Sequence, residues 1–173
     1  ICATFMVLLY FQAALYTPPF YKQRQFEDSI GGRLQHIIEQ NAPNRTILAL
    51  SPGIYPLWPM INYIDGRMAL RFLTLWVLQG VYATCDDFPA LYNPPDTMGE
   101  SEKFVFDAVS DDFAREHPDL LIVDRIAGIP RCQGKEFDYL EYFLQNRTFA
   151  DAFEGYDHLM DFDRYRIYRR KKK

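Results

Sequence analysis

The stretch HPDLLIVD, residues 117–124, decides the fold of this chain. Residues 120–123 form a continuous apolar run, which is typical of a strand buried on both faces of a parallel sheet. The pair His117 and Pro118 ends the helix that is predicted before this run, because proline cannot continue a helix. A buried strand that follows a helix so closely predicts a layered α/β domain.

Further helices and strands alternate on both sides of this run. The predicted helices are residues 24–42, residues 54–63 (a helix or turn region), a helix that follows the capping-box pattern TMGE at residues 97–100 and ends at His117, residues 137–144, and a short helix from residue 148. The predicted strands are residues 46–50, 120–123, 158–162 and 165–170, and a further strand is expected within residues 67–75. Gly31 and Gly32 lie inside the first helix and indicate a site of close packing. We therefore expect a mostly parallel sheet that ends in an antiparallel hairpin.

Residues 1–16, ICATFMVLLYFQAALY, contain no charged side chain, and only Gln12 is strongly polar. This stretch is slightly shorter than the roughly 20 residues that span a bilayer, so we interpret it as the end of a transmembrane helix. A signal peptide is the main alternative, although the charged region that should precede it is absent, and a buried core helix is the third. We divide the chain into residues 1–20, the end of the transmembrane helix, and residues 21–173, a soluble α/β domain with a basic tail.

The distribution of charge argues against nucleic acid as a partner. The net charge is −4, and the basic residues gather at the C-terminal end instead of covering a face. The basic residues at this end are Arg164, Arg166, Arg169, Arg170 and Lys171 to Lys173. They indicate a frayed, solvated tail or, alternatively, a contact with anionic lipid head groups.

The segment SPGIYPLWPMINY, residues 51–63, lies where open α/β sheets bind ligands, outside the carboxyl end of a strand. It has neither G-x-G-x-x-G nor P-loop spacing, so no motif supports nucleotide binding. Its aromatic side chains could line a groove for a sugar or lipid, and two arginines on one strand face could hold a phosphate. The predicted substrate-binding residues are Tyr55, Trp58, Arg67 and Arg71. In the structural alternative, the arginines pair with Asp65, Asp86 or Asp87.

The other chemistry-bearing residues do not form a catalytic or metal-binding motif. Asp124 follows the buried strand, where a carboxylate is either catalytic or closes the strand through a salt bridge, and we favour the salt bridge. Ser51 lacks the G-x-S-x-G elbow of hydrolases, and the three histidines have no metal-ligand spacing. Cys85 and Cys132 are either free thiols or a disulfide pair. We predict no catalytic residue, no metal and no cofactor.

Several stretches together resemble one family of bacterial membrane proteins. They are SPGIYPLWPMINY, RMALRF at residues 67–72 with Trp76 and Tyr82, HPDLLIVD, FDYLEYF at residues 137–143 and the ending YRIYRR. The resemblance covers most of residues 44–170 and is to the C-terminal soluble region of polytopic C-type glycosyltransferases, which are related to protein mannosyltransferases and lipid A aminoarabinose transferases.

This resemblance implies a polyprenyl-phosphate-linked sugar donor and a bundle of membrane helices before the soluble region. It also implies an extracytoplasmic domain that helps to cover the active-site cavity or to bind the acceptor. The catalytic acid of the family lies in an early external loop, so no catalytic residue is carried over to this chain.

We accordingly expect an accessory domain of a membrane glycosyltransferase, on the periplasmic side of the bacterial inner membrane. Its expected partners are membrane lipid and, through the membrane part, a polyprenyl-phosphate sugar. Lys22 and Arg24 argue for the cytoplasmic side, because positive charge near a membrane helix favours that side. The alternative function is a non-catalytic binding or interaction domain of another polytopic membrane protein.

Overall fold

A five-stranded mixed sheet forms the centre of the computed structural model, which describes residues 25–84, 91–131 and 135–172. The strand order is β2-β1-β3-β5-β4, in which β2, β1 and β3 are parallel and the last two strands form an antiparallel hairpin. The strands are β1 (Thr46–Leu50), β2 (Arg67–Met68), β3 (Leu120–Asp124), β4 (Tyr156–Phe162) and β5 (Tyr165–Arg170). The predicted α/β sheet with a C-terminal antiparallel hairpin is therefore confirmed.

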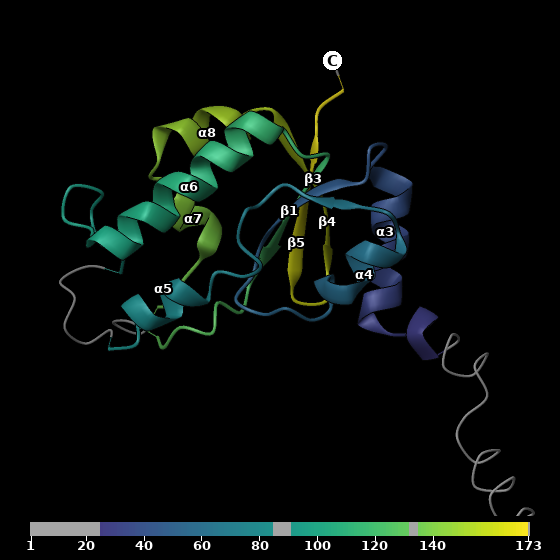
Figure 1. The fold of residues 1–173 in the computed structure, drawn as a ribbon, viewed down its shortest axis with the longest axis horizontal. Coiled ribbons are helices and arrows are strands. Elements are labelled where there is room, and N and C mark those ends of the chain that lie inside the picture. The colour runs from purple at the N-terminus through teal and green to yellow at the C-terminus, as the bar shows by residue number, and fades with distance from the viewer. Residues whose placement is uncertain (1–24, 85–90, 132–134, 173) are drawn as a thin grey trace, which may run out of the picture.

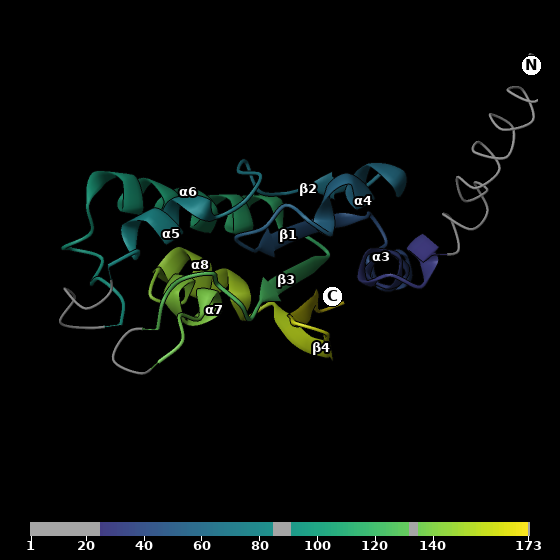
Figure 2. The same cartoon turned by 90° about the horizontal axis from the view of Figure 1, so that it is seen from below.

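Helices cover both faces of the sheet (Figure 1). Figure 2 shows the resulting three layers from below, with α3 and α4 on one side of the sheet and α5 to α8 on the other. The helices are α3 (Ile30–Asn41), α4 (Leu57–Tyr63), α5 (Trp76–Val81), α6 (Glu100–Glu116), α7 (Tyr139–Phe143) and α8 (Arg147–Phe153).

Alternation along the strands divides the apolar core into two halves. In β1, Leu48 and Leu50 pack against the layer of α5 to α8, whereas Ile47 and Ala49 pack against α3 and α4. Strand β3 lies beside β1 in the middle of the sheet, and all five of its residues are buried. Val123 is opposite Leu50 and fully buried, as the continuous apolar run predicts.

Helix α3 begins later than the prediction from residue 24, because Ser29 caps it. The Ser29 Oγ accepts a hydrogen bond from the backbone N–H of Gly32 (3.2 Å), an arrangement that satisfies an otherwise unpaired donor. The predicted close packing is present at both glycines. A Cβ on Gly31 would lie 3.3 Å from the Phe26 ring and 3.5 Å from Pro56, and a Cβ on Gly32 would lie 2.1 Å from the Phe26 carbonyl oxygen.

The strand predicted within residues 67–75 is present as β2, which contains only Arg67 and Met68. The chain nevertheless continues alongside β1 without regular pairing. The N–H of Ala69 donates to the carbonyl of Ile47 (2.7 Å), and the N–H of Leu75 donates to the carbonyl of Ser51 (2.9 Å). This irregular segment brings the start of α5 to the carboxyl end of β1.

The predicted end of α6 at His117 is confirmed, but the predicted capping box at residues 97–100 does not form. The helix starts after Gly99, which provides no side-chain hydrogen bond. The hydroxyl of Thr97 donates to the carbonyl of Pro94 (3.0 Å) and is therefore engaged in a turn. At the other end, His117 adopts a left-handed conformation (φ 42°) and ends the helix, as its position before a proline predicts.

The prediction of a frayed basic tail is wrong for the arginines of the ending. Arg166 and Arg170 belong to β5, where ordered ion pairs join Arg166 to Asp138 (2.6 Å) and Arg170 to Asp119 (3.0 Å). These arginines fasten the last strand to the rest of the domain.

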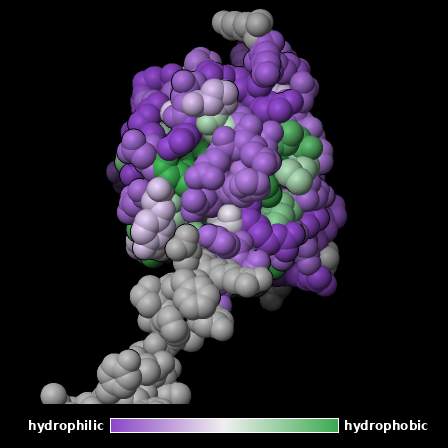
Figure 3. Space-filling view, turned by 90° about the vertical axis from the view of Figure 1, so that its right-hand side faces the viewer, coloured by the Kyte–Doolittle hydropathy of each residue, from purple (hydrophilic) through white to green (hydrophobic). Residues whose placement is uncertain are grey.

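No helix among the described residues is long and apolar enough to cross a membrane. The predicted transmembrane segment, residues 1–20, lies outside the described residues, as do Cys85 and Cys132. The side of the domain that carries α3 and α4 is largely hydrophilic, with smaller hydrophobic patches between the polar side chains (Figure 3).

Candidate functional site

Three loops and one hairpin turn meet at the carboxyl end of the parallel strands, in the lower part of Figure 1. The segment before α5 joins the loop after β1 through the hydrogen bond from Leu75 to Ser51. Helix α5 joins the loop after β3, where Gln79 Nε2 donates to the carbonyl of Gly128 (3.2 Å). Because open α/β sheets bind ligands at this edge, it is the first candidate site.

Asp124 lies at the centre of this edge, and donors from three segments hold its buried carboxylate. Ser51 Oγ donates to Oδ2 (3.0 Å), and the N–H of Ile126 donates to Oδ1 (2.9 Å). From the β4–β5 turn, Arg164 donates through Nε to Oδ1 (2.7 Å) and through Nη2 to Oδ2. A carboxylate has about four acceptor sites, so these donors saturate it. The salt bridge favoured from the sequence is present.

The pKa shifts at this edge also reflect the pairing of Arg164 with Asp124. The hydrogen bond to Asp124 raises the pKa of Arg164, against the opposing effect of burial. Burial also raises the pKa of the neighbouring Tyr165 to about 12, with the Asp124 charge as the next cause. The edge therefore holds a fixed ion pair and a neutral phenol at physiological pH.

Large apolar side chains project from the same loops and are more than half exposed. We define the apolar edge as these five residues: Ile54, Tyr55, Leu73, Trp76 and Ile126. Single exposed apolar residues are common on proteins, but several from converging loops indicate an interaction surface.

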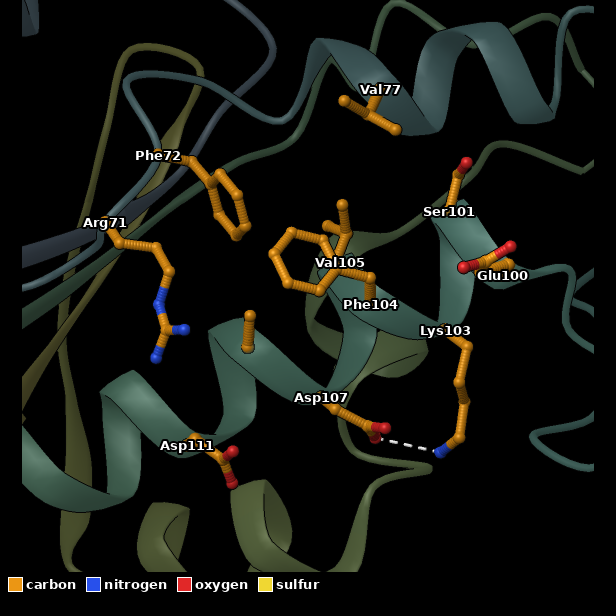
Figure 4. Close-up of a pocket in the computed structure, with 11 residues that line it drawn as sticks. Arg71, Phe72, Val77, Glu100, Ser101, Lys103, Phe104, Val105, Asp107 and Asp111 are labelled. Carbon is orange, nitrogen blue, oxygen red and sulfur yellow. Dashed lines mark hydrogen bonds and ion pairs between the residues drawn. The ribbon is translucent and has the colours of Figure 1, made fainter.

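A groove of about 860 Å³ between α6 and the segment before α5 is the second candidate site. Figure 4 shows Phe72 and Phe104 next to each other in its lining, with Val77 of α5 above them. The two rings meet edge to face, with centroids 5.8 Å apart, and Phe104 is more than half exposed. The groove therefore offers an apolar, aromatic wall to a ligand.

Charged side chains stand at both ends of this groove (Figure 4). Lys103 pairs with Asp107 (2.8 Å) at one end. At the other end, Arg71 donates to both carboxylate oxygens of Asp112 through Nε (2.9 Å) and Nη2 (2.7 Å), and this hydrogen bonding raises the pKa of Arg71. An aromatic wall flanked by fixed charges suits a ligand with an apolar face and several hydroxyl groups, such as a sugar.

The structure separates two of the predicted substrate-binding residues along β1. Arg67 pairs in register with Thr46 at the amino end of β1, and it forms an ion pair with Glu116 (2.5 Å). Tyr55 follows the carboxyl end of the same strand and is exposed there. These two side chains therefore do not share a surface.

The other two predicted residues have different surroundings again. Trp58 is half buried against the core beneath α3 and α4, and its Nε1 is buried without a hydrogen-bond partner among the described residues. Arg71 lines the groove. The acids that bind Arg67 and Arg71 are Glu116 and Asp112 of α6. Asp65 is neither of these partners, and the two other acids expected as partners, residues 86 and 87, lie outside the described residues.

Sequence reasoning missed a buried polar cluster around Glu102 of α6. The side chain is 1% exposed, and its Oε1 accepts hydrogen bonds from the hydroxyls of Tyr82 (2.5 Å) and Tyr142 (3.0 Å). Asn93 Nδ2 donates to Oε2 (2.8 Å). Burial raises the pKa of both tyrosines. The signal was present in the sequence, since Glu102 lies three residues before Val105 on the apolar stripe of the helix.

The described residues contain no group of three His, Cys, Asp or Glu side chains that could hold a metal ion. The chain matches no known family model, and comparisons with curated proteins and with solved structures gave no match either.

Proposed function

We propose that this chain is the accessory C-terminal domain of a bacterial membrane glycosyltransferase that uses a polyprenyl-phosphate-linked sugar, with the domain on the periplasmic side. The observation that carries the proposal is the saturated carboxylate of Asp124. Many α/β enzymes place a reactive acid at this position. Here Ser51, Ile126 and Arg164 donate hydrogen bonds to the carboxylate, which therefore has a structural role. A domain fastened in this way supplies a rigid surface, and the membrane part supplies the chemistry.

The sequence supports the same proposal independently of the site. The resemblance to C-type glycosyltransferases extends over most of residues 44–170 and includes the segments that form β1, β3 and the C-terminal hairpin. Residues 1–16 are apolar and uncharged, as expected for the end of a membrane helix that leads into the domain.

In the proposed reaction, a nucleophilic oxygen or nitrogen of the acceptor attacks the anomeric carbon of the donor sugar. The bond from that carbon to the lipid phosphate breaks, and polyprenyl phosphate leaves with the electron pair. The carboxylate that accepts the proton lost by the acceptor belongs to the membrane part. The role of this domain is to cover the active site and to hold the acceptor, for which the groove lined by Phe72 and Phe104 has suitable chemistry.

A second candidate function is a non-catalytic binding domain of another polytopic membrane protein. The same groove favours it, because an aromatic wall with charged ends can hold a ligand without any transfer reaction.

Assays of the whole protein in membranes with radiolabelled polyprenyl-phosphate sugars test the proposal. We expect transfer by the whole protein, loss of transfer when residues 21–173 are deleted, and no transfer by a fragment of those residues alone. Turnover by the fragment would contradict the accessory role. A whole protein that binds sugars but transfers none would favour the second candidate function.

A further inference from the structure

The apolar edge and the start of the described chain lie at the same end of the domain. Phe26 and Pro56 both flank Gly31, which places the beginning of the described chain beside the loop that carries Ile54 and Tyr55. Figure 1 shows the first described turn, in purple, at the lower right, near the end where β1 and β3 terminate.

The length of chain before this point limits how far the edge can be from the predicted membrane segment. Residues 17–24 separate Tyr16 from Gln25, and eight residues span at most about 30 Å when fully extended. A compact domain of this size has a radius of gyration of roughly 15 Å. The connection is therefore no longer than the domain is wide, and the end that carries the apolar edge must be close to the bilayer.

The composition of the apolar edge fits the boundary between lipid head groups and acyl chains. Tyrosine and tryptophan are enriched at that boundary, because their rings are apolar and their polar atoms remain hydrated. Tyr55 and Trp76 contribute such rings, and three aliphatic side chains accompany them. The nearby Arg125 already pairs with Asp161 (3.5 Å), and Arg164 with Asp124, so the contact depends little on anionic lipid.

We propose that the apolar edge rests on the surface of the lipid bilayer, with Tyr55 and Trp76 in the interfacial layer. The inference rests on the membrane location in the proposed function. This placement disfavours a lipid contact through Lys171 and Lys172, because the C-terminus lies at the opposite end of the domain (Figure 1). A domain held on the bilayer in this way keeps a fixed height above the lipid-linked donor.

Tryptophan quenching by brominated lipid tests this inference on the full chain reconstituted in vesicles of zwitterionic lipid. The chain has two tryptophans, so Trp58→Phe leaves Trp76 as the only reporter. We expect bromine on the acyl chains to reduce Trp76 fluorescence about twofold, since interfacial side chains lie about 5–10 Å into the head-group boundary. The matched control combines Trp58→Phe, Trp76→Phe and Lys172→Trp, which moves the reporter to the exposed opposite end. We expect no quenching there.

Equal quenching of the two reporters, or stronger quenching at residue 172, would overturn the inference. Unquenched but blue-shifted Trp76 fluorescence would also overturn it, because the edge would then be covered by protein. If the Trp58→Phe variant does not fold, the quenching of Trp76 is obtained as the difference between the wild-type chain and the Trp76→Phe variant. Carbonate extraction separates the two proposals: release of the chain contradicts the membrane location as well, whereas a retained chain with unquenched Trp76 contradicts only the lipid contact.

Discussion

Arg164 binds both carboxylate oxygens of Asp124 and so joins the β4–β5 turn to the carboxyl end of the central strand. The Asp124 side chain is fully buried, whereas Arg164 is about one-third exposed (35%). Removing one member of a buried pair leaves an uncompensated charge, which costs more than an exposed pair contributes.

We therefore predict that Arg164→Met lowers the free energy of unfolding by about 3 kcal/mol. Urea unfolding of the chain in detergent measures this change. Arg125→Met is the matched control, because Arg125 and Asp161 are both about half exposed and their pair contributes less than about 1 kcal/mol. An equal decrease in the free energy of unfolding for the two variants would show that the Asp124–Arg164 pair stabilises the domain no more than an exposed pair does.

Val123 and Ile126 provide a second comparison within three residues of chain. Val123 is fully buried in β3, and Ile126 is more than half exposed in the following loop. We predict that Val123→Asp lowers the free energy of unfolding by about 4 kcal/mol or more, since an unpaired charge enters a dry core. Ile126→Asp should change it by less than about 0.5 kcal/mol. A thermal melt of Val123→Asp that matches wild type would contradict the central position of β3.

The sequence patterns were informative where a feature is local. A continuous apolar run needs no partner to be recognised, so β1 and β3 were predicted at the correct positions. The second strand covers only the first two residues of the segment 67–75 in which it was predicted, because residues after Met68 bond to β1 at only some positions. Such partial pairing depends on how the segment turns toward α5, and no periodic pattern encodes it.

The ion-pair partners of the predicted site residues Arg67 and Arg71 could not be predicted from the sequence either. The sequence neighbours of Arg67 and Arg71 suggested Asp65, Asp86 and Asp87 as partners. The actual acids belong to α6, 41 residues from Arg71 and 49 from Arg67. Tertiary packing decides which distant carboxylate approaches a guanidinium, so the spacing of residues in one segment cannot identify it.

Two helical glycines give opposite predictions for the same substitution. A Cβ on Gly32 would overlap the carbonyl oxygen of Phe26 at 2.1 Å, whereas a Cβ on Gly80 meets nothing within 4 Å. We predict that Gly32→Ala destabilises the domain by about 1–3 kcal/mol, because backbone must move. Gly80→Ala should stabilise it by about 0.5–1 kcal/mol through reduced chain entropy. Thermal unfolding of both variants measures the difference, and destabilisation by Gly80→Ala would be the contrary result.

Asp112 is expected to make stability depend on pH. Burial alone would raise its pKa, but hydrogen bonds from Arg71 and Arg115 lower it below the ordinary value of 3.8. A carboxyl whose folded pKa is depressed contributes stability above its unfolded pKa and loses this contribution as pH falls through the folded pKa. The stability difference between wild type and Asp112→Asn should therefore be constant from pH 7 to about pH 5 and shrink below 3.8.

Urea unfolding of both proteins between pH 7 and pH 3 tests this dependence. Asp151→Asn is a suitable control, because the pair of Asp151 with Arg147 is exposed on both sides. Its effect should be small throughout this range. A difference for Asp112→Asn that grows as the pH falls has the wrong sign and would refute the assignment.

Substitutions of Arg71 and Arg67 test whether the acceptor binds in the groove, because only one of these two predicted substrate-binding residues lines it. Arg71 lines the groove, while Arg67 binds Glu116 near the amino end of β1. We predict that Arg71→Ala lowers sugar transfer by the whole protein about tenfold, because a hydrogen bond to a charged group contributes about 1.5–3 kcal/mol. Arg67→Ala should leave transfer unchanged.

Folding must be checked first, since Arg71 also holds Asp112. After its removal Arg115 still donates to Asp112 (2.6 Å), so the carboxylate keeps one charged partner and the variant is expected to fold. Arg67→Ala removes an exposed pair and is expected to cost less than about 1 kcal/mol. Because both variants remove one guanidinium beside α6, a general loss of charge would affect them alike. If Arg67→Ala alone impaired transfer, the acceptor would bind outside the groove; if both folded proteins were fully active, neither arginine would belong to a substrate site.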